Sequence, residues 1–285
     1  MRINTNVGSL ISQESAVNTN KNLTSSLEKL SSGLRINKAS DDASGLSIAD
    51  KLRTQASSLG QSISNGNSAV ALTQIADKAM AEQSNILDII KTKLIQASTA
   101  TTSAEGRNAI AKDITKLIDQ IDNISTQTNY NGISLLDDGA GGVSTALTFQ
   151  MGETSADTIA TDGSVQANQT GLGLGTLYTA ASTDTDGTTL TTAVATTAMA
   201  TVDSALDTLN GWRADFGSTQ NQLESALRNQ MTQQTNIKAA ESVIRDVDYA
   251  AESANFNKNN IIAQAGTYAM SQANAVSQNV MRLLQ

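Results

Sequence analysis

Few residues in this chain of 285 have the side-chain types that enzyme or metal chemistry needs. The sequence has no His and no Cys. It therefore offers no imidazole base beside a nucleophile, no thiolate ligand and no HExxH zinc motif. Carboxylates remain, and they form short acidic runs at residues 41–42, 184–187 and 246–248. The conceivable chemistry is limited to oxygen-ligand metal binding and carboxylate acid–base catalysis.

The acidic runs fit turns and helix caps better than metal sites. If Gly187 is the sixth residue of a calcium loop, the twelfth is Ala193, where a bidentate Glu is required. The pairs at 41–42 and 246–248 have no other ligand type nearby, and Asp is a preferred N-cap. The glycine run at 171–175 lacks a strand-to-helix context. We predict no catalytic residue, no metal site and no cofactor.

The composition favours long helices. The chain contains no Pro, where ordinary usage gives roughly 14, and only 3% of its residues are aromatic. Helical spacing of apolar residues predicts a weakly amphipathic helix over 1–34 and a very long helix over 43–99. An antiparallel helix follows over 110–124. Helical spacing returns from 193 to 244, and again after 249.

The middle of the chain changes character. Leu147, Phe149 and Met151 alternate with polar residues, and residues 158–161 supply a strand partner. Glycine-rich and polar runs around them are typical of loops. The sequence thus predicts a mainly α fold. Both chain ends form a long antiparallel helical bundle or coiled coil, with a small β-hairpin region in the middle.

Two polar joints interrupt the helices at mirrored places. Leu23, Leu27, Leu30 and Leu34 are spaced four, three, four, and then RINKASDDASG (35–45) supplies cap and turn residues. The pattern is compatible with a hinge between two coiled-coil layers or with an ordinary helix–loop–helix. Because the leucine seam is thin, we expect the first helix to be disordered unless partners cover it.

The charge is unevenly placed. Residues 117–212 hold none of the 19 basic residues but 11 of the 27 acidic ones. An acidic middle with near-neutral ends argues against nucleic-acid binding, which needs a basic surface. No segment has the apolar run of a cleaved signal peptide or a membrane span, so we predict neither a cleaved signal nor membrane insertion.

Four segments resemble bacterial flagellins, the subunits of flagellar filaments. They are LSSGLRINKASDDASGLSIADKLR (30–53), TNYNGISLLDDG (128–139), ESVIRDVDYAAESANF (241–256) and IIAQAGTYAMSQANAVSQNVMRLLQ (261–285). The resemblance extends over about 1–140 and 195–285, which indicates a short form with a reduced variable middle region.

The resemblance implies three parts. Residues 1–42 and 246–285 would form an inner terminal coiled-coil layer that is disordered in the monomer. Residues 43–140 and 193–245 would form a rod-like helical domain. Residues 141–192 would be a short variable surface region with a β-hairpin and loops.

The resemblance also implies function and partners. The expected function is that of a structural subunit, not an enzyme, which self-assembles into the helical filament for swimming. The expected partners are other copies of the chain, filament cap and hook-junction proteins, the export apparatus and a secretion chaperone on the C-terminal helix. Alternatives are a hook–filament junction protein or a secreted adhesin, and the close C-terminal match favours the filament subunit.

Site residues follow from the seams and joints. The expected filament-core interface comprises Leu23, Leu27, Leu30, Leu34, Val276, Val280, Leu283 and Leu284. The expected inter-layer joint comprises Arg35, Asn37, Asp41, Asp42, Asp246 and Asp248.

Two further sets rest on the resemblance. Flagellins sensed by the innate flagellin receptor carry a signature of the type LQRVRELAVQ, which is degenerate here at Leu87, Ile89, Ile90, Lys91, Thr92 and Lys93. We therefore expect weak or no receptor activation. Some flagellins carry O-linked sugars in the middle region, where the candidates are Ser144, Thr145, Ser155, Ser164, Ser182 and Thr183.

Overall fold

The computed structural model describes residues 5–137, 146–161, 165–184 and 186–283, with only the backbone described for residue 277 and for 279–283. The described residues contain six α-helices and two two-stranded antiparallel sheets, which confirms the mainly α fold class. Contacts divide the chain into two compact units. The terminal unit is Met1–Ser57 with Gln234–Gln285, and the central unit is Ser58–Gln233.

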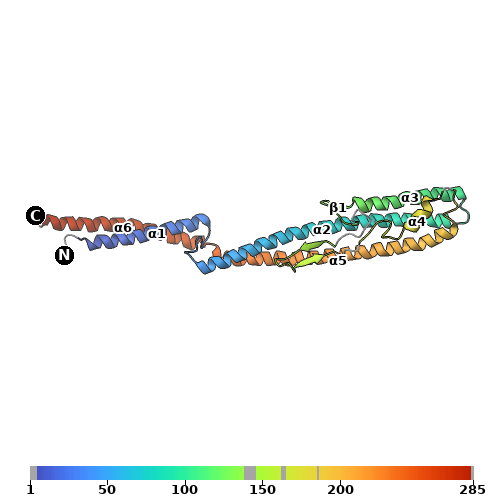
Figure 1. The fold of residues 1–285 in the computed structure, drawn as a ribbon. Coiled ribbons are helices and arrows are strands. Elements are labelled where there is room, and N and C mark those ends of the chain that lie inside the picture. Colours follow the sequence, from blue (N-terminus) through green and yellow to red (C-terminus); the bar gives the residue numbers. More distant parts are fainter. Residues whose placement is uncertain (1–4, 138–145, 162–164, 185, 284–285) are drawn as a thin grey trace. The chain divides into compact units, whose positions relative to one another are not determined.

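In the terminal unit, α1 (Val7–Ser32) and α6 (Tyr249–Leu283) lie side by side (Figure 1). Their Cα atoms approach to within 8 Å. Helix α1 buries only Thr19 and Ser26, and no described residue of α6 is buried. Small side chains at a helix seam let the backbones come close, so the larger apolar side chains are left outside the seam.

Polar groups fix both ends of α1. At its start, Asn6 Oδ1 accepts a hydrogen bond from the Ser9 amide at 3.2 Å, and Asn6 Nδ2 donates to the Ala273 carbonyl of α6 at 3.0 Å. At its end, Gly33 has φ 74° and its amide donates to the Lys29 carbonyl. A left-handed glycine after the last helical residue is a common C-cap.

Two long helices, α2 (Ala43–Ser98) and α5 (Thr192–Arg245), contribute to both units. In the central unit they pack with α3 (Ala104–Gln127) and α4 (Gly175–Ser182) around one large hydrophobic core. The predicted stripe on α3 is the buried face of that helix. The largest fully buried side chains are Met80, Leu87, Ile90, Leu94, Ile114, Ile118, Ile121, Leu136, Leu174, Leu190, Leu209 and Leu223.

The strands are short. β1 (Asn129–Tyr130) pairs with β2 (Ile133–Ser134), and β3 (Thr148–Gln150) pairs with β4 (Thr158–Ala160). The second pair is the predicted hairpin, in which Phe149 lies opposite Ile159. The first pair turns at Asn131-Gly132, the dipeptide that two-residue hairpin loops prefer.

One helix lies where the sequence pattern predicts only hairpin and loops. Helix α4 begins at the last glycine of the 171–175 run, and Leu174 at its N-cap and Leu177 in its first turn are 0% and 2% exposed. The eight residues of α4 are rich in Gly, Thr and Ser, and α4 is too short for a helical period to be recognised. It forms because its leucines enter the core, an instance of tertiary packing overriding local propensity.

Candidate functional site

The terminal unit carries a surface of exposed large apolar side chains. On α1 their exposed fractions run from 51% at Leu27 to 62% at Val17. On α6, Ile261 is 67% exposed and Tyr268 83%. Scattered apolar residues are normal on protein surfaces, whereas larger groups of exposed apolar side chains are typical of interaction sites. We call this set the terminal apolar surface: Val7, Leu10, Ile11, Val17, Leu27, Ile261, Ile262, Tyr268 and Val276.

The predicted filament-core residues only partly coincide with this surface. Leu27 and Val276 belong to it, whereas Leu23, Leu30 and Leu34 are half-buried within the unit. The side chains of Val280 and Leu283, and the whole of Leu284, lie outside the described residues. The leucine spacing drew attention to one half of α1.

The other half of α1 contributes the members that the leucine spacing missed: Val7, Leu10, Ile11 and Val17. The only sequence signal for these four residues is that they are apolar in an otherwise polar helix.

A groove of about 650 Å³ lies beside Leu23 and Leu27. At its edge Lys38 Nζ and Glu28 Oε2 form an ion pair at 2.7 Å. The hydrogen bond that Lys38 donates to Glu28, together with the negative charge of Glu28, raises the pKa of Lys38. The groove therefore combines two leucine side chains with polar side chains and a paired charge.

The two polar joints meet through backbone hydrogen bonds. The Arg35 amide donates to the Arg245 carbonyl at 2.6 Å, and the Val247 amide donates to the Gly33 carbonyl at 3.0 Å. Leu34 and Asp246 thereby form an isolated antiparallel bridge. Although residues 33–35 and 245–247 are far apart in sequence, the fold makes them one structural element.

The predicted joint side chains hold the helix ends around this bridge. Arg35 donates from Nε and Nη2 to the Ile244 carbonyl, at 3.3 and 2.6 Å, near the end of α5. Asp41 Oδ2 accepts from the amides of Asn37 and Lys38, at 3.1 and 3.0 Å. Those backbone bonds lower the pKa of the Asp41 carboxyl.

The remaining joint residues act at helix starts and across the joint. Asp42 Oδ1 accepts from the Gly45 amide at 2.8 Å at the start of α2. Asp248 Oδ1 accepts from the first amides of α6, those of residues 250 and 251, at 2.9 and 3.1 Å. Asn37 Nδ2 donates to Ser32 Oγ at 2.7 Å. These are the capping roles expected from the residue types.

Sequence reasoning missed several joint residues. The Tyr249 hydroxyl donates to the Leu30 carbonyl at 2.8 Å and ties α6 to α1. Arg245 Nη1 lies 3.7 Å from Asp50 Oδ1. Ile36 is 2% exposed and lies beside Gly45, where a Cβ would come within 2.8 Å of its Cδ1. Among the joint residues that were not predicted, only Gly33, which lies between Leu30 and Leu34 of the leucine seam, carried a recognisable local signal, that of a glycine C-cap.

The six residues aligned with the receptor signature lie in the central unit on α2, and they divide by exposure. Leu87 and Ile90 are fully buried in the core. Ile89 is 46% exposed and Thr92 is exposed. Only the second pair, with the two lysines, presents side chains at the surface.

Both lysines of that stretch are in ion pairs. Lys91 Nζ lies 2.5 Å from Asp203 Oδ1 on α5, and Lys93 Nζ lies 3.0 Å from Asp113 Oδ2 on α3. The hydrogen bond to Asp203 raises the pKa of Lys91. Both pairs hold their lysine heads against this unit's own helices.

The candidate glycosylation residues are placed where the structure describes them. Ser155, Ser182 and Thr183 are exposed. The Thr183 hydroxyl donates to the Thr179 carbonyl at 2.7 Å, which leaves its oxygen facing solvent. Ser144, Thr145 and Ser164 lie outside the described residues.

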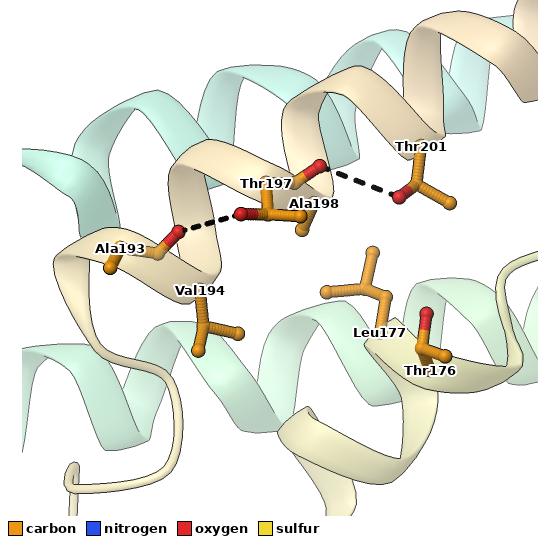
Figure 2. Close-up of a pocket in the computed structure, with 7 residues that line it drawn as sticks. All are labelled: Thr176, Leu177, Ala193, Val194, Thr197, Ala198 and Thr201. Atoms are coloured by element: carbon orange, nitrogen blue, oxygen red, sulfur yellow. Dashed lines mark hydrogen bonds between the residues drawn. The ribbon is translucent and has the colours of Figure 1, made fainter.

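One pocket of the central unit is lined by side chains that cannot ionise. The groove between α4 and the start of α5 measures about 280 Å³ and is lined by threonine, alanine, valine and leucine side chains (Figure 2). Thr197 and Thr201 donate their hydroxyl protons to carbonyls of α5. With no ionisable group among its lining residues, this pocket has no acid, base or nucleophile pair.

A metal site needs clustered ligating side chains and a membrane span needs a long apolar helix, and the described ranges offer neither. Within them no group of three or more Asp, Glu, His or Cys side chains could hold a metal ion. Nor is any described helix both long enough and apolar enough to cross a lipid bilayer. Both oxygens of Asp184, in the run that resembles a calcium loop, accept backbone amides of residues 189 and 190.

Comparison with known proteins agrees with this geometry. Residues 3–140 match the sequence model of the bacterial flagellin N-terminal helical region, and residues 199–284 match that of the C-terminal helical region. The chain is 34% identical over 292 residues to the flagellar filament 33 kDa core protein of Treponema phagedenis, and both chains are covered completely. It is 36% identical over 307 residues to the flagellin of Bacillus subtilis, again with complete coverage of both.

A solved structure shares the fold at much lower identity. The putative flagellar hook-associated protein from Vibrio parahaemolyticus aligns with a TM-score of 0.59 and 11% identity, over 72% of this chain and 99% of that one. At that identity the likeness concerns the fold alone. The two terminal matches and the full-length relatives carry the assignment: this chain belongs to the bacterial flagellin family.

Proposed function

We propose that this chain is the structural subunit of a flagellar filament, in which copies associate through α1 and α6 to form a helical homopolymer used for swimming. The observation that carries the proposal is the terminal apolar surface. Contacts between different patches of successive copies, when they do not close a ring, generate an open helix. The full-length filament relatives support the same function.

Burial of this surface against a neighbour would favour assembly. Full burial of one large apolar side chain is worth about 1.5–3 kcal/mol. The side chains of the terminal apolar surface are already partly covered in the monomer. Each would therefore gain roughly 1 kcal/mol when a neighbour covers the rest of it. Each copy contributes several such side chains.

The test is polymerisation of a variant in which Leu10, Ile11 and Val17 are all replaced by Ser. We expect at least a tenfold rise in the critical concentration, measured by sedimentation after seeding with filament fragments. Fluorescence of the single Trp212 should show an unchanged central unit. A matched variant with Ser at the exposed polar positions 13, 18 and 20 of the same helix should polymerise normally. Unimpaired assembly of the first variant would refute the proposal.

The three-part division belongs to the same proposal. Residues 1–42 and 246–285 would be the inner layer that neighbours order, 43–140 with 193–245 the rod, and 141–192 the surface region. Amide hydrogen exchange tests it. The amides of α1 and α6 should exchange fast in the monomer and slowly in the filament, while those of α3 should be protected in both. Equal protection of α1 and α3 in the monomer would contradict an inner layer that needs neighbours.

The proposed joint follows from this division. Arg35, Asn37, Asp41, Asp42, Asp246 and Asp248 would hold the inner layer to the rod, since their hydrogen bonds are directed at helix ends and turn amides.

Export and partners are proposed on family grounds. The chain would leave the cell through the flagellum's own export apparatus, without a cleaved signal, with a chaperone on its C-terminal helix. It would meet hook-junction and cap proteins at the filament ends. A purely structural role without catalysis fits a chain without His or Cys. A junction protein or an adhesin is not favoured, because the full-length relatives named above are filament proteins.

We propose that the innate flagellin receptor is activated weakly or not at all. Two of the six aligned side chains are buried, and both lysines are paired with aspartates of the same unit. A variant with Ile89→Arg, Thr92→Glu and Lys93→Leu should activate a receptor reporter more than the parent chain does. Full activation by the parent would refute the proposal.

We also propose that sugars are attached in the surface region. Exposed Ser155, Ser182 and Thr183 are the described candidates. Native filaments should then have an intact mass above the 29.7 kDa of the bare chain. A mass equal to that of the bare chain would contradict the modification.

A further inference from the structure

The dipeptide Asn-Gly occurs three times in this chain, at 65–66, 131–132 and 210–211. Its chemistry is distinctive because Gly has no side chain to shield its backbone nitrogen. That nitrogen can attack the side-chain amide carbon of the preceding Asn. The three copies share this chemistry but lie in different backbone environments, so the fold decides which of them reacts.

Two of the copies are inside long helices. Asn65-Gly66 lies in α2 and Asn210-Gly211 in α5. In a helix interior each amide donates to the carbonyl four residues earlier, so the glycine nitrogen is engaged. Asn65 is further restrained, since its Oδ1 accepts from Gln61 Nε2 at 2.9 Å and Gly66 is buried. Reaction there requires a helix of more than fifty residues to open in its interior.

The third copy forms the turn between β1 and β2. Both Asn131 and Gly132 are exposed, with φ of 53° and 80°. Asn131 is the one non-glycine residue with positive φ in the described part of the chain. The Gly132 amide donates to no described residue.

The strands on either side of this turn are two residues long. Isolated hairpins of this kind are marginal and open at low free-energy cost. The conformation that brings the Gly132 nitrogen to the Asn131 side chain is therefore far more accessible here than in either helix.

We propose that Asn131 is a site of spontaneous deamidation. The Gly132 nitrogen forms a bond to Asn131 Cγ, the Cγ–Nδ2 bond breaks, and the amide leaves as ammonia carrying the glycine proton. The product is a five-membered succinimide. Water then adds to one of its two carbonyl carbons, giving aspartate or isoaspartate. The reaction needs water and consumes no oxidant or reductant.

The product changes a specific place in the central unit. It adds a negative charge to a stretch, 117–212, that holds no basic residue. Isoaspartate also lengthens the main chain by one carbon at the turn that leads into Leu135 and Leu136, which are 2% and 0% exposed.

The experiment compares the three copies within one molecule. The full folded chain is incubated in mildly alkaline buffer, digested, and mapped by mass spectrometry, with isoaspartyl methyltransferase labelling to detect isoaspartate. Trypsin leaves Asn131 and Asn210 on one peptide because 117–212 has no Lys or Arg, so a protease that cleaves at Phe149 and Tyr178 is used. A urea-denatured sample gives the deamidation rates of the same three sites in the unfolded chain.

In the folded chain, the early deamidation rate at Asn131 should exceed that at Asn65 and Asn210 by at least tenfold. In urea the three rates should converge. Asn131→Gln should abolish the isoaspartate signal of the peptide that contains residue 131, because its ring would have six members and forms far more slowly, while the signals at Asn65 and Asn210 should be unchanged. Equal rates at all three sites in the folded chain would overturn the proposal. So would an unmodified Asn131 at a time when the denatured sample has reacted.

Discussion

The two units of this chain are built from the same kind of helix but bury different things. In the central unit, α2, α3 and α5 close around residues such as Leu94 and Ile118, which are 0% exposed. In the terminal unit, α1 buries only Thr19 and Ser26, and its large apolar side chains are half-buried or exposed. A closed core makes the first unit self-sufficient. The second is held by a close seam, helix caps and a backbone bridge, and the side chains of its terminal apolar surface are exposed.

The units also differ in how their helices are fixed. Burial of apolar area dominates folding energy, and the central unit has it in abundance. The joint of the terminal unit depends instead on individual hydrogen bonds, each worth about 0.5–1.5 kcal/mol net. Three predictions test this contrast, from the largest expected effect to the smallest.

Removing the same side chain from each unit should give unequal losses. Leu94→Ala empties part of a filled core, and we expect a loss of about 2–5 kcal/mol in the free energy of unfolding. Leu27→Ala removes a side chain that is 51% exposed, and the loss should stay below about 0.5 kcal/mol in the monomer. Urea denaturation followed by Trp212 fluorescence and circular dichroism measures both. Similar losses would show that the terminal unit is as closed as the central one.

Adding a methyl group should destabilise the central unit and stabilise the terminal unit. At Gly66 a Cβ would come within 2.7 Å of Leu227 Cδ2 and 2.8 Å of Met151 Cε, so Gly66→Ala should cost about 1–3 kcal/mol. At Gly266 of α6 a Cβ meets nothing within 4 Å, so Gly266→Ala should stabilise the helix by about 0.5–1 kcal/mol. Thermal unfolding by circular dichroism compares them. A stabilised Gly66→Ala would argue that the central core is loosely packed.

Acid should act on the two units with opposite sign. The Asp41 carboxyl at the joint has a pKa below its usual 3.8, because the Lys38 and Asn37 amides bind its charged form. The stability that the Asp41 carboxylate contributes to the folded state is present above pH 3.8 and is lost as the pH falls through the lowered pKa. Burial, outweighing its bond from the Gln169 amide, raises the pKa of Asp122 in the central unit. The stability that protonated Asp122 contributes to the folded state is complete below pH 3.8 and is lost as the pH rises through the raised pKa.

The measurement is hydrogen exchange between pH 3 and pH 6 at two sites. Amides of residues 37 and 38 should lose protection on acidification, while α3 should gain it. Asp122→Asn should raise the melting temperature of the central unit at neutral pH and remove its share of the pH dependence. Asp186→Asn, at an exposed carboxyl, serves as the control and should change little. A neutral-pH loss in Asp122→Asn would contradict the assignment.

Several features could be read from the sequence because local rules determine them. The absence of Pro and the helical spacing gave the long helices to within a few residues, and alternation at 147–151 gave the β3–β4 pair. Asp42 and Asp248 were recognised as caps because the N-cap preference is a property of the residue and its immediate neighbours. The terminal motifs were long enough to identify the family without any structure.

Only the tertiary structure decided which side chains are inside. Leu23 and Leu27 share one sequence pattern, yet one is half-buried and the other exposed, since burial depends on where α6 lies. The bridge between Leu34 and Asp246 joins residues more than two hundred positions apart, and no local signal specifies such a pairing. Likewise three identical Asn-Gly dipeptides differ only in the backbone that holds them. The sequence by itself determined where the long helices lie and to which family the chain belongs, while packing determined that α4 forms and which apolar side chains stay exposed.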